Sequence, residues 1–163
     1  MSPLIRGLLA GGIQLGLIFV VAGKYAIDRA TLPRVWVKAA PYDPQLPVRG
    51  RYVRLSLFAI LKSPAGPEYS LKENLELSAV NNQLIATPTE ADTEIRAIYE
   101  QDGSARLQEP VAFFIPEGIP DPSRRPPGEE LWAEVTVPKH GPPRPLRLGV
   151  KALGVLRPLD AIH

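Results

Sequence analysis

The chain has 163 residues with a formal net charge of +2 at pH 7, and it contains no cysteine. The absence of cysteine excludes disulfides, thiolate zinc sites and a cysteine nucleophile. A net charge of +2 is too small to indicate a nucleic-acid-binding protein. The length accommodates one ordinary domain and a membrane anchor, but not two full domains.

The N-terminal segment is predicted to be a membrane-spanning helix. Residues 7–23 carry no charged side chain and are flanked by Arg6 and Lys24. At the α-helical rise this run covers about 25 Å, and residues 25–27 extend it towards the roughly 30 Å of a bilayer core. The alternative is a cleaved signal peptide, with residues 20–22 as the cleavage site. The length of the apolar run favours a retained anchor, because signal-peptide cores have about 7–15 apolar residues. We therefore assign residues 1–30 to the anchor and 31–163 to a separate domain.

Small residues on this helix form a candidate contact surface for other helices. Gly12 and Gly16 are four residues apart on one stripe, whereas Gln14, the single strongly polar side chain in the run, lies beside a second stripe of Gly7 and Gly11. Small residues at this spacing let helices approach closely in lipid, and an amide can hydrogen-bond across the contact. The partner would be a second copy of the chain or a multi-span membrane protein. The simpler interpretation, which we favour, is that glycine is common in membrane helices.

The flanking charges leave the orientation of the anchor open. Arg6 precedes the apolar run, whereas Lys24, Arg29, Arg34 and Lys38 follow it. Counting these charges favours a cytoplasmic domain, because basic residues are enriched on the cytoplasmic side. A short basic N-terminus followed by an apolar core is, however, typical of export signals, and a long following domain reduces the weight of charge counts.

After Pro33, which is expected to end the helix, the sequence predicts short strands. Residues 34–38 alternate between polar and apolar, and residues 52–61 place Val53, Leu55 and Leu57 on one face of a strand. Residues 71–85 are compatible with a helix or a strand, and residues 87–92 are expected to be a polar break.

Two hairpins are predicted further along the chain. The pair Asp102-Gly103 between residues 93–101 and 104–108 is typical of a tight β-turn. A second hairpin pairs residues 130–138 with 145–153 and places Glu134 opposite Arg147 or Lys151. Residues 116–128 are expected to be a surface loop. The predicted fold is therefore mainly β: a small antiparallel β sandwich or barrel-like domain after one N-terminal transmembrane helix.

The segment 50–57 resembles the motif of the bacterial GDYXXLXY family. Gly50, Tyr52 and Leu55 match the motif, whereas Arg51 replaces its aspartate and Leu57 its final tyrosine. Independently of the resemblance, Gly50 stands where a turn enters a strand, and Tyr52 and Leu55 fall on opposite faces of that strand. We therefore interpret the motif as structural rather than as a binding site.

Further along, residues 113–118 are similar to an aromatic segment of the same family. The resemblance implies a protein anchored in the bacterial inner membrane by a single span, with an extracytoplasmic β domain, often encoded beside a multi-span membrane protein. It implies no activity and no cofactor.

Catalytic and metal-binding patterns are weak. His140 stands in a predicted turn and His163 is the C-terminal residue, so a catalytic triad or a histidine metal site is not expected. Residues 90–94 contain three carboxylates but lack the spacing of a calcium loop, and we expect a solvated turn. A serine–lysine dyad remains an alternative, and by residue type its candidates are Ser56, Ser63 and Ser70 with Lys62, Lys72 or Lys151.

The distribution of charge gives one further hypothesis. Residues 29–62 and 139–157 are mainly basic, whereas residues 68–134 are mainly acidic. If the first strands adjoin the last hairpin, the basic segments form one surface that could meet anionic lipid, although ordinary solvated strand faces are equally compatible. The sequence thus predicts a non-catalytic, membrane-anchored interaction or structural module that contacts the bilayer and a partner membrane protein. The alternatives are an envelope hydrolase of serine–lysine type and a secreted free domain.

Overall fold

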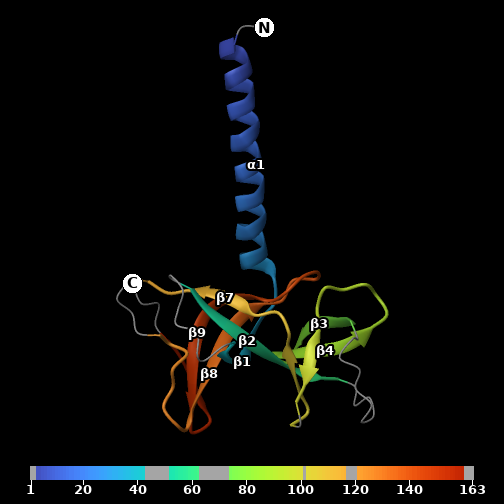
Figure 1. Ribbon diagram of the computed structural model, residues 1–163, viewed down its shortest axis with the longest axis vertical. Coiled ribbons are helices and arrows are strands. Elements are labelled where there is room, and N and C mark those ends of the chain that lie inside the picture. The colour runs from blue at the N-terminus through green and yellow to red at the C-terminus, as the bar shows by residue number, and fades with distance from the viewer. Residues whose placement is uncertain (1–2, 43–51, 63–73, 101, 117–120, 160–163) are drawn as a thin grey trace. The chain divides into compact units, whose positions relative to one another are not determined.

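The computed structural model describes residues 3–42, 52–62, 74–100, 102–116 and 121–159 (Figure 1). The chain divides into two compact units, Met1–Leu32 and Pro33–His163. The first unit is a helix and the second is a β domain, so the mainly β fold predicted from the sequence is confirmed.

Helix α1, Pro3–Thr31, forms the first unit. Its segment Ile5–Thr31 is 27 residues long, has a mean hydropathy of 1.9 and is not buried against the protein, so it is long and apolar enough to cross a membrane. The last turn is closed by the hydroxyl of Thr31, which donates to the carbonyl oxygen of Ile27 at 2.8 Å, and Pro33 follows. The helix therefore ends where the proline predicts.

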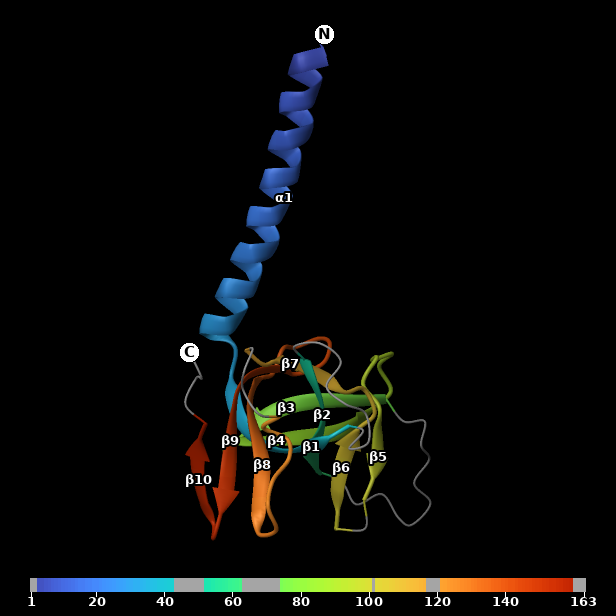
Figure 2. The same ribbon diagram turned by 60° about the vertical axis from the view of Figure 1, so that its left-hand side comes forward.

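The β domain is one curled sheet in the form of a half-barrel (Figure 2). Its main path of hydrogen-bonded neighbours runs β10-β9-β8-β1-β2-β4-β3. Strand β2 pairs with β1 and β4 along one edge and with β7 and β6 along its opposite edge, and β5 pairs with β6. Among the described strands, the β2–β4 pairing is parallel and all others are antiparallel. The strands are β1 Arg34–Pro41, β2 Tyr52–Leu61, β3 Asn74–Val80, β4 Gln83–Thr89, β5 Ala97–Tyr99, β6 Ser104–Leu107, β7 Val111–Phe114, β8 Glu129–Thr136, β9 Arg144–Ala152 and β10 Val155–Pro158.

Alternate residues of the strands build the core. The face of β2 predicted to be apolar is buried, with Val53, Leu55 and Leu57 exposed by 5%, 0% and 0%. On the opposite face Tyr52 is exposed, and its ring meets that of Phe114 edge to face with the centroids 5.6 Å apart. The two described residues of the GDYXXLXY-like motif thus lie on opposite faces of β2, whereas Gly50 lies outside the described residues.

The ambiguous segment 71–85 is resolved as part of a hairpin. Strands β3 and β4 are joined by Asn81 and Asn82, whose φ angles are 49° and 60°. Asparagine tolerates this left-handed region better than most residues, so the pair makes a tight turn without glycine. The predicted polar break at 87–92 is wrong in its first part, because β4 continues to Thr89. Pro88 is accommodated there because β2 pairs with β4 only at Ile85 and Ala86.

Both predicted hairpins are present. The limits of the second shift by one or two residues, whereas the first strand of the first hairpin, predicted over 93–101, is only the three-residue β5. Gly103, with a φ of 80°, turns the chain between β5 and β6. Strands β8 and β9 pair with Glu134 opposite Arg147, as predicted. The short strands β7 and β10 were not predicted from the sequence.

Substitutions in β2 separate the structural contribution of the motif's leucine from that of its tyrosine. Leu55→Ala is expected to lower the free energy of unfolding by about 2–5 kcal/mol, because it leaves a cavity in the core. Tyr52→Ala should cost about 0.5–1.5 kcal/mol, since it removes one exposed ring contact. Urea unfolding of the full chain in detergent micelles measures both values. A larger cost for Tyr52→Ala would contradict the assignment of Leu55 as the core residue of the motif.

Candidate binding groove

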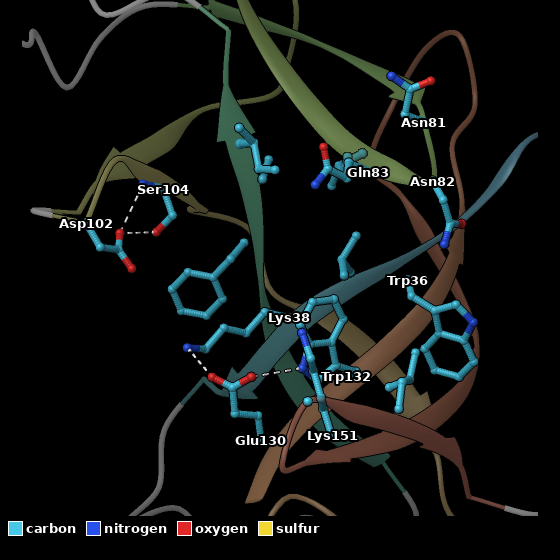
Figure 3. A pocket seen from close by; sticks show the side chains of 17 residues that line it. Trp36, Lys38, Asn81, Asn82, Gln83, Asp102, Ser104, Glu130, Trp132 and Lys151 are labelled. Carbon is cyan, nitrogen blue, oxygen red and sulfur yellow. Dashed lines mark hydrogen bonds and ion pairs between the residues drawn. The ribbon is translucent and has the colours of Figure 1, made fainter. Parts of the chain in front are cut away.

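A groove of about 560 Å³ lies on the β domain, within the roughly 300–1,000 Å³ typical of ligand-binding clefts (Figure 3). Its lining includes residues of β1, β2, β8, β9 and β10. The turns between β3 and β4 and between β5 and β6 also contribute to it. We call this site the tryptophan groove, because both tryptophans of the chain, Trp36 and Trp132, line it.

Strand alternation places the two indoles on the same side of the sheet. Val35 and Val37 of β1 point into the core, so Trp36 between them points to the opposite face. Strand β8 pairs with β1 so that Trp132 stands opposite Lys38. Residues directly opposite each other project from the same face of a sheet, which brings Trp132 into the groove as well.

The indole of Trp36 packs closely against Gly149 and lies beneath Arg147, which is part of an ion pair. A Cβ atom added at Gly149 would lie 2.8 Å from Cζ3 of Trp36 and 3.0 Å from the carbonyl oxygen of Arg157, so the indole occupies space that a side chain there would need. The guanidinium of Arg147 lies over the indole, 5.4 Å from its centroid. Its Nε donates to Oε2 of Glu134 at 2.6 Å, and only 9% of Glu134 is exposed. The predicted Glu134–Arg147 contact therefore also orients a groove residue.

Trp132 is held by a second set of charges. Nζ of Lys151 lies 4.6 Å from the centroid of its ring. The indole Nε1 donates to Oε2 of Glu130 at 3.2 Å, and Nζ of Lys38 lies 2.9 Å from Oε1 of the same carboxylate. The hydrogen bonds from Lys38 and then Trp132 hold the pKa of Glu130 below its ordinary value. Glu130 is thus the anion that links a cation and an indole of the groove.

The rim of the groove is polar. Asn81 and Asn82 of the β3–β4 turn and Gln83, the first residue of β4, are exposed, and in the part of the chain that the structure describes their side-chain amides make no hydrogen bond. Oδ1 of Asp102 accepts from the backbone nitrogen of Ser104 at 2.9 Å and from its hydroxyl at 2.6 Å. These two bonds lower the pKa of the Asp102 carboxyl. Figure 3 shows the amides and Asp102 around the same opening.

The lining of the groove has equal numbers of positively and negatively charged side chains. Lys38 and Lys151 contribute two positive charges, and Asp102 and Glu130 contribute two negative ones. Across the described ranges, no group of three or more histidine, cysteine, aspartate or glutamate side chains is placed to hold a metal ion. The groove is therefore neutral as a whole, although charged groups line it.

The residues of the serine–lysine alternative are scattered or outside the described ranges. Ser56 is 3% exposed within β2, whereas Lys62 is exposed just after that strand. Lys151 is in the groove over Trp132. Ser63, Ser70 and Lys72 lie outside the described residues, and so does His163.

Other predicted features are placed individually. Gly12, Gln14 and Gly16 lie on α1, where a Cβ at either glycine would meet no atom within 4 Å. His140 is exposed in the connection between β8 and β9. These residues do not contribute to the groove.

The described strands of the two basic segments are joined through β8, and two of their cations are paired with carboxylates. Strand β1 pairs with β8 and β8 with β9, as the hypothesis required. However, Lys38 is paired with Glu130 and Arg147 with Glu134. For these two cations the pairing favours the alternative of ordinary solvated strand faces, because acidic residues of β8 lie between them, whereas contact with anionic lipid stays a prediction.

Comparisons of the chain with known protein families, with curated proteins and with solved structures find no match. The resemblance to the GDYXXLXY family therefore stays a prediction. The groove residues have to be interpreted from their own chemistry.

The contact between Trp36 and Gly149 gives a stability prediction. Gly149→Ala is expected to lower the free energy of unfolding by about 1–3 kcal/mol, because the new methyl group displaces the indole or β10. In a Trp36→Ala background the same substitution should cost less, since one of the two close neighbours is gone. A double-mutant cycle from urea unfolding measures this difference. Equal costs in both backgrounds would show that the indole does not occupy the space above Gly149.

The ion pair of Glu130 gives a pH prediction. Because the pKa of Glu130 is lowered from 4.5 in the folded state, its ionised form stabilises the fold above pH 4.5, and this contribution is lost as the pH falls through the folded-state pKa. Its side chain is 43% exposed, so Glu130→Gln should cost at most about 1 kcal/mol at neutral pH and nothing once the carboxyl is protonated. Urea unfolding between neutral and acidic pH measures this. Glu76→Gln on the exposed face of β3 is the matched control, and an equal pH profile for the two variants would exclude the assigned role of Glu130.

Proposed function

We propose that the chain is a membrane-anchored, non-catalytic binding module of the bacterial envelope. The observation that carries the proposal is α1. Its segment Ile5–Thr31 has the length and apolarity for a span and is not covered by the protein. An exposed apolar helix of this length is unfavourable in water and stable in lipid, so the bilayer is the environment that the helix fits.

The chemistry of the groove supports binding more than catalysis. A serine nucleophile needs a base that accepts its proton, but Ser104 donates to Asp102, whose lowered pKa makes it a weak base. Lys38 is engaged by Glu130, and Lys151 lies over an indole. Each charged group of this set therefore already has a partner that holds it in place, as expected for a site that positions a ligand.

The proposed location is the inner membrane, with the β domain on the extracytoplasmic side. A short basic N-terminus before an apolar segment supports this orientation, and so does the GDYXXLXY-like motif. The proposed partner is a membrane protein that contacts α1 through the small-residue face of Gly12 and Gly16 or through the amide of Gln14. Gly12 and Gly16 share one face of α1, whereas Gln14 projects from the opposite face. All three are exposed, so either face is available to such a partner or to a second copy of the chain.

Retention in the membrane tests the anchor. The chain, expressed in a bacterial host, is expected to remain in the carbonate-washed membrane fraction at its full mass of 17.8 kDa. The variant Leu15→Arg/Ile18→Arg should be lost from that fraction, because each arginine near the centre of a span costs about 2.5–3.5 kcal/mol. Leu15→Ile/Ile18→Leu is the matched control. A shorter, water-soluble mature species would overturn the anchor.

The same preparation reports the orientation and the partner. Because the chain has no cysteine, Glu109→Cys in the exposed β6–β7 connection introduces a single thiol. A membrane-impermeant thiol reagent should label this residue in cells with an intact inner membrane. Labelling only after lysis would place the domain in the cytoplasm. Photo-crosslinking residues are placed separately at Gln14 and at Phe19, which lies on the face of Gly12 and Gly16. At least one of them should form an adduct with a membrane protein or with a second copy of the chain, and adducts with lipid alone at both positions would contradict the proposed helix partner.

A further inference from the structure

We infer that the tryptophan groove binds a neutral oligosaccharide. The inference names the ligand class of the binding module proposed above and rests on that proposal. It concerns the β domain alone, however, so sugar binding and membrane anchoring can each fail independently of the other.

The indole of Trp132 offers a surface on which a sugar ring can stack, whereas one face of Trp36 is covered by Arg147, which Glu134 holds in place. Aromatic faces carry partial negative charge and attract groups that carry partial positive charge. The cations of Arg147 and Lys151 over Trp36 and Trp132 show this attraction within the protein. The C–H groups on one face of a pyranose are apolar and slightly positive, so they can take a similar position over an indole. Lys151 is attached through a flexible stem and can move aside when a sugar stacks on Trp132.

The rim supplies groups that match sugar hydroxyls. A hydroxyl both donates and accepts hydrogen bonds, and so does a side-chain amide. Asn81, Asn82 and Gln83 place three amides on one side of the opening, and these amides make no hydrogen bond within the described ranges. Asp102 adds an exposed carboxylate acceptor on the rim (Figure 3). Apolar faces combined with a few converging polar groups are the typical composition of a small-molecule site.

The charges and the strand pairing distinguish this ligand from other classes. Two lysines and two carboxylates line the groove, so it has no excess charge to attract a nucleotide, a phosphate or an acidic peptide. An extended peptide usually binds by adding a strand to an open sheet edge. Strands β8 and β9, which carry Trp132 and Lys151, are each paired on both sides, so they offer no such edge to a peptide beside Trp132, whereas β10 at the end of the sheet path pairs with β9 alone. A neutral ligand with many hydroxyl groups fits both observations.

Tryptophan fluorescence tests the inference directly, because both indoles of the chain belong to the groove. The full chain is kept in lauryldimethylamine oxide micelles, which contribute neither a sugar nor an indole. It is titrated separately with tri-N-acetylchitotriose, cellotriose and maltotriose. At least one of them is expected to change the emission in a saturable way at millimolar concentration or below, and saturation-transfer NMR should show contact with the sugar C–H groups.

Variants connect the binding to the groove. Asn81→Gly/Asn82→Gly removes two amides while glycine keeps the positive φ angles of the turn, and it is expected to weaken binding about tenfold. Trp132→Phe should weaken binding by a similar factor, since the stacking surface shrinks. Phe114→Leu removes an exposed aromatic ring that does not line the groove, and it should leave the affinity unchanged. Thermal unfolding of each variant shows that the domain is still folded.

Three outcomes would overturn the inference. The first is that none of the trisaccharides changes the emission or gives an NMR signal. The second is that a sugar binds to both Asn81→Gly/Asn82→Gly and Trp132→Phe as tightly as to the unchanged chain, which would place the sugar elsewhere. The third comes from two control titrations, one with the polyanion polygalacturonate and one with a glycine–serine peptide. It is that one of these controls changes the emission whereas no trisaccharide does. Retention of the chain in the membrane fraction is unaffected by any of these results, so it still tests the anchor separately.

Discussion

Hydrogen bonding of strand β2 on both of its edges is the constraint on which the rest of the β domain depends. One edge pairs with β1 and then with β4, and the other pairs with β7 and then with β6. Leu55 and Leu57 lie at the crossing of these pairings and are fully buried. Because β2 pairs with four different strands along its length, the sheet curls. The curl brings the β3–β4 and β5–β6 turns to the face of β1 and β8. The groove exists as a consequence of this pairing.

The strands with clear alternation could be predicted from the sequence, whereas the pairing between distant segments could not. Residues 52–61 were predicted with their limits, since apolar and polar side chains alternate and a core lies on one side. The β3–β4 hairpin was not recognised, because its turn is Asn81-Asn82 rather than a glycine-containing pair. The parallel pairing of β2 with β4 has no local signal, since it depends on how the whole chain returns to β2.

The groove was missed for a related reason. Trp36 and Trp132 stand at polar-face positions of alternating strands, which is a signal for a functional surface, but their proximity depends on the β1–β8 register. The Glu134–Arg147 pair was predicted from the hairpin alone, because both residues belong to neighbouring strands with a short connection. Two features could not be predicted from the sequence. One is the position of Arg147 over the Trp36 ring, and the other is that the Asn81-Asn82 turn lines the same groove.

The register of β1 against β8 has a consequence for how the domain folds. Val35 lies opposite Val135, so the first strand of the domain finds this partner only after most of the domain has been synthesised. Contacts between residues so far apart in sequence are slow to form, because a long loop must close before they stabilise anything. Until β8 arrives, one edge of β1 and the apolar residues beneath it stay uncovered. A nascent chain held at its N-terminal helix would therefore remain open to chaperones, proteases and non-native strand pairing until its C-terminal hairpin completes the sheet.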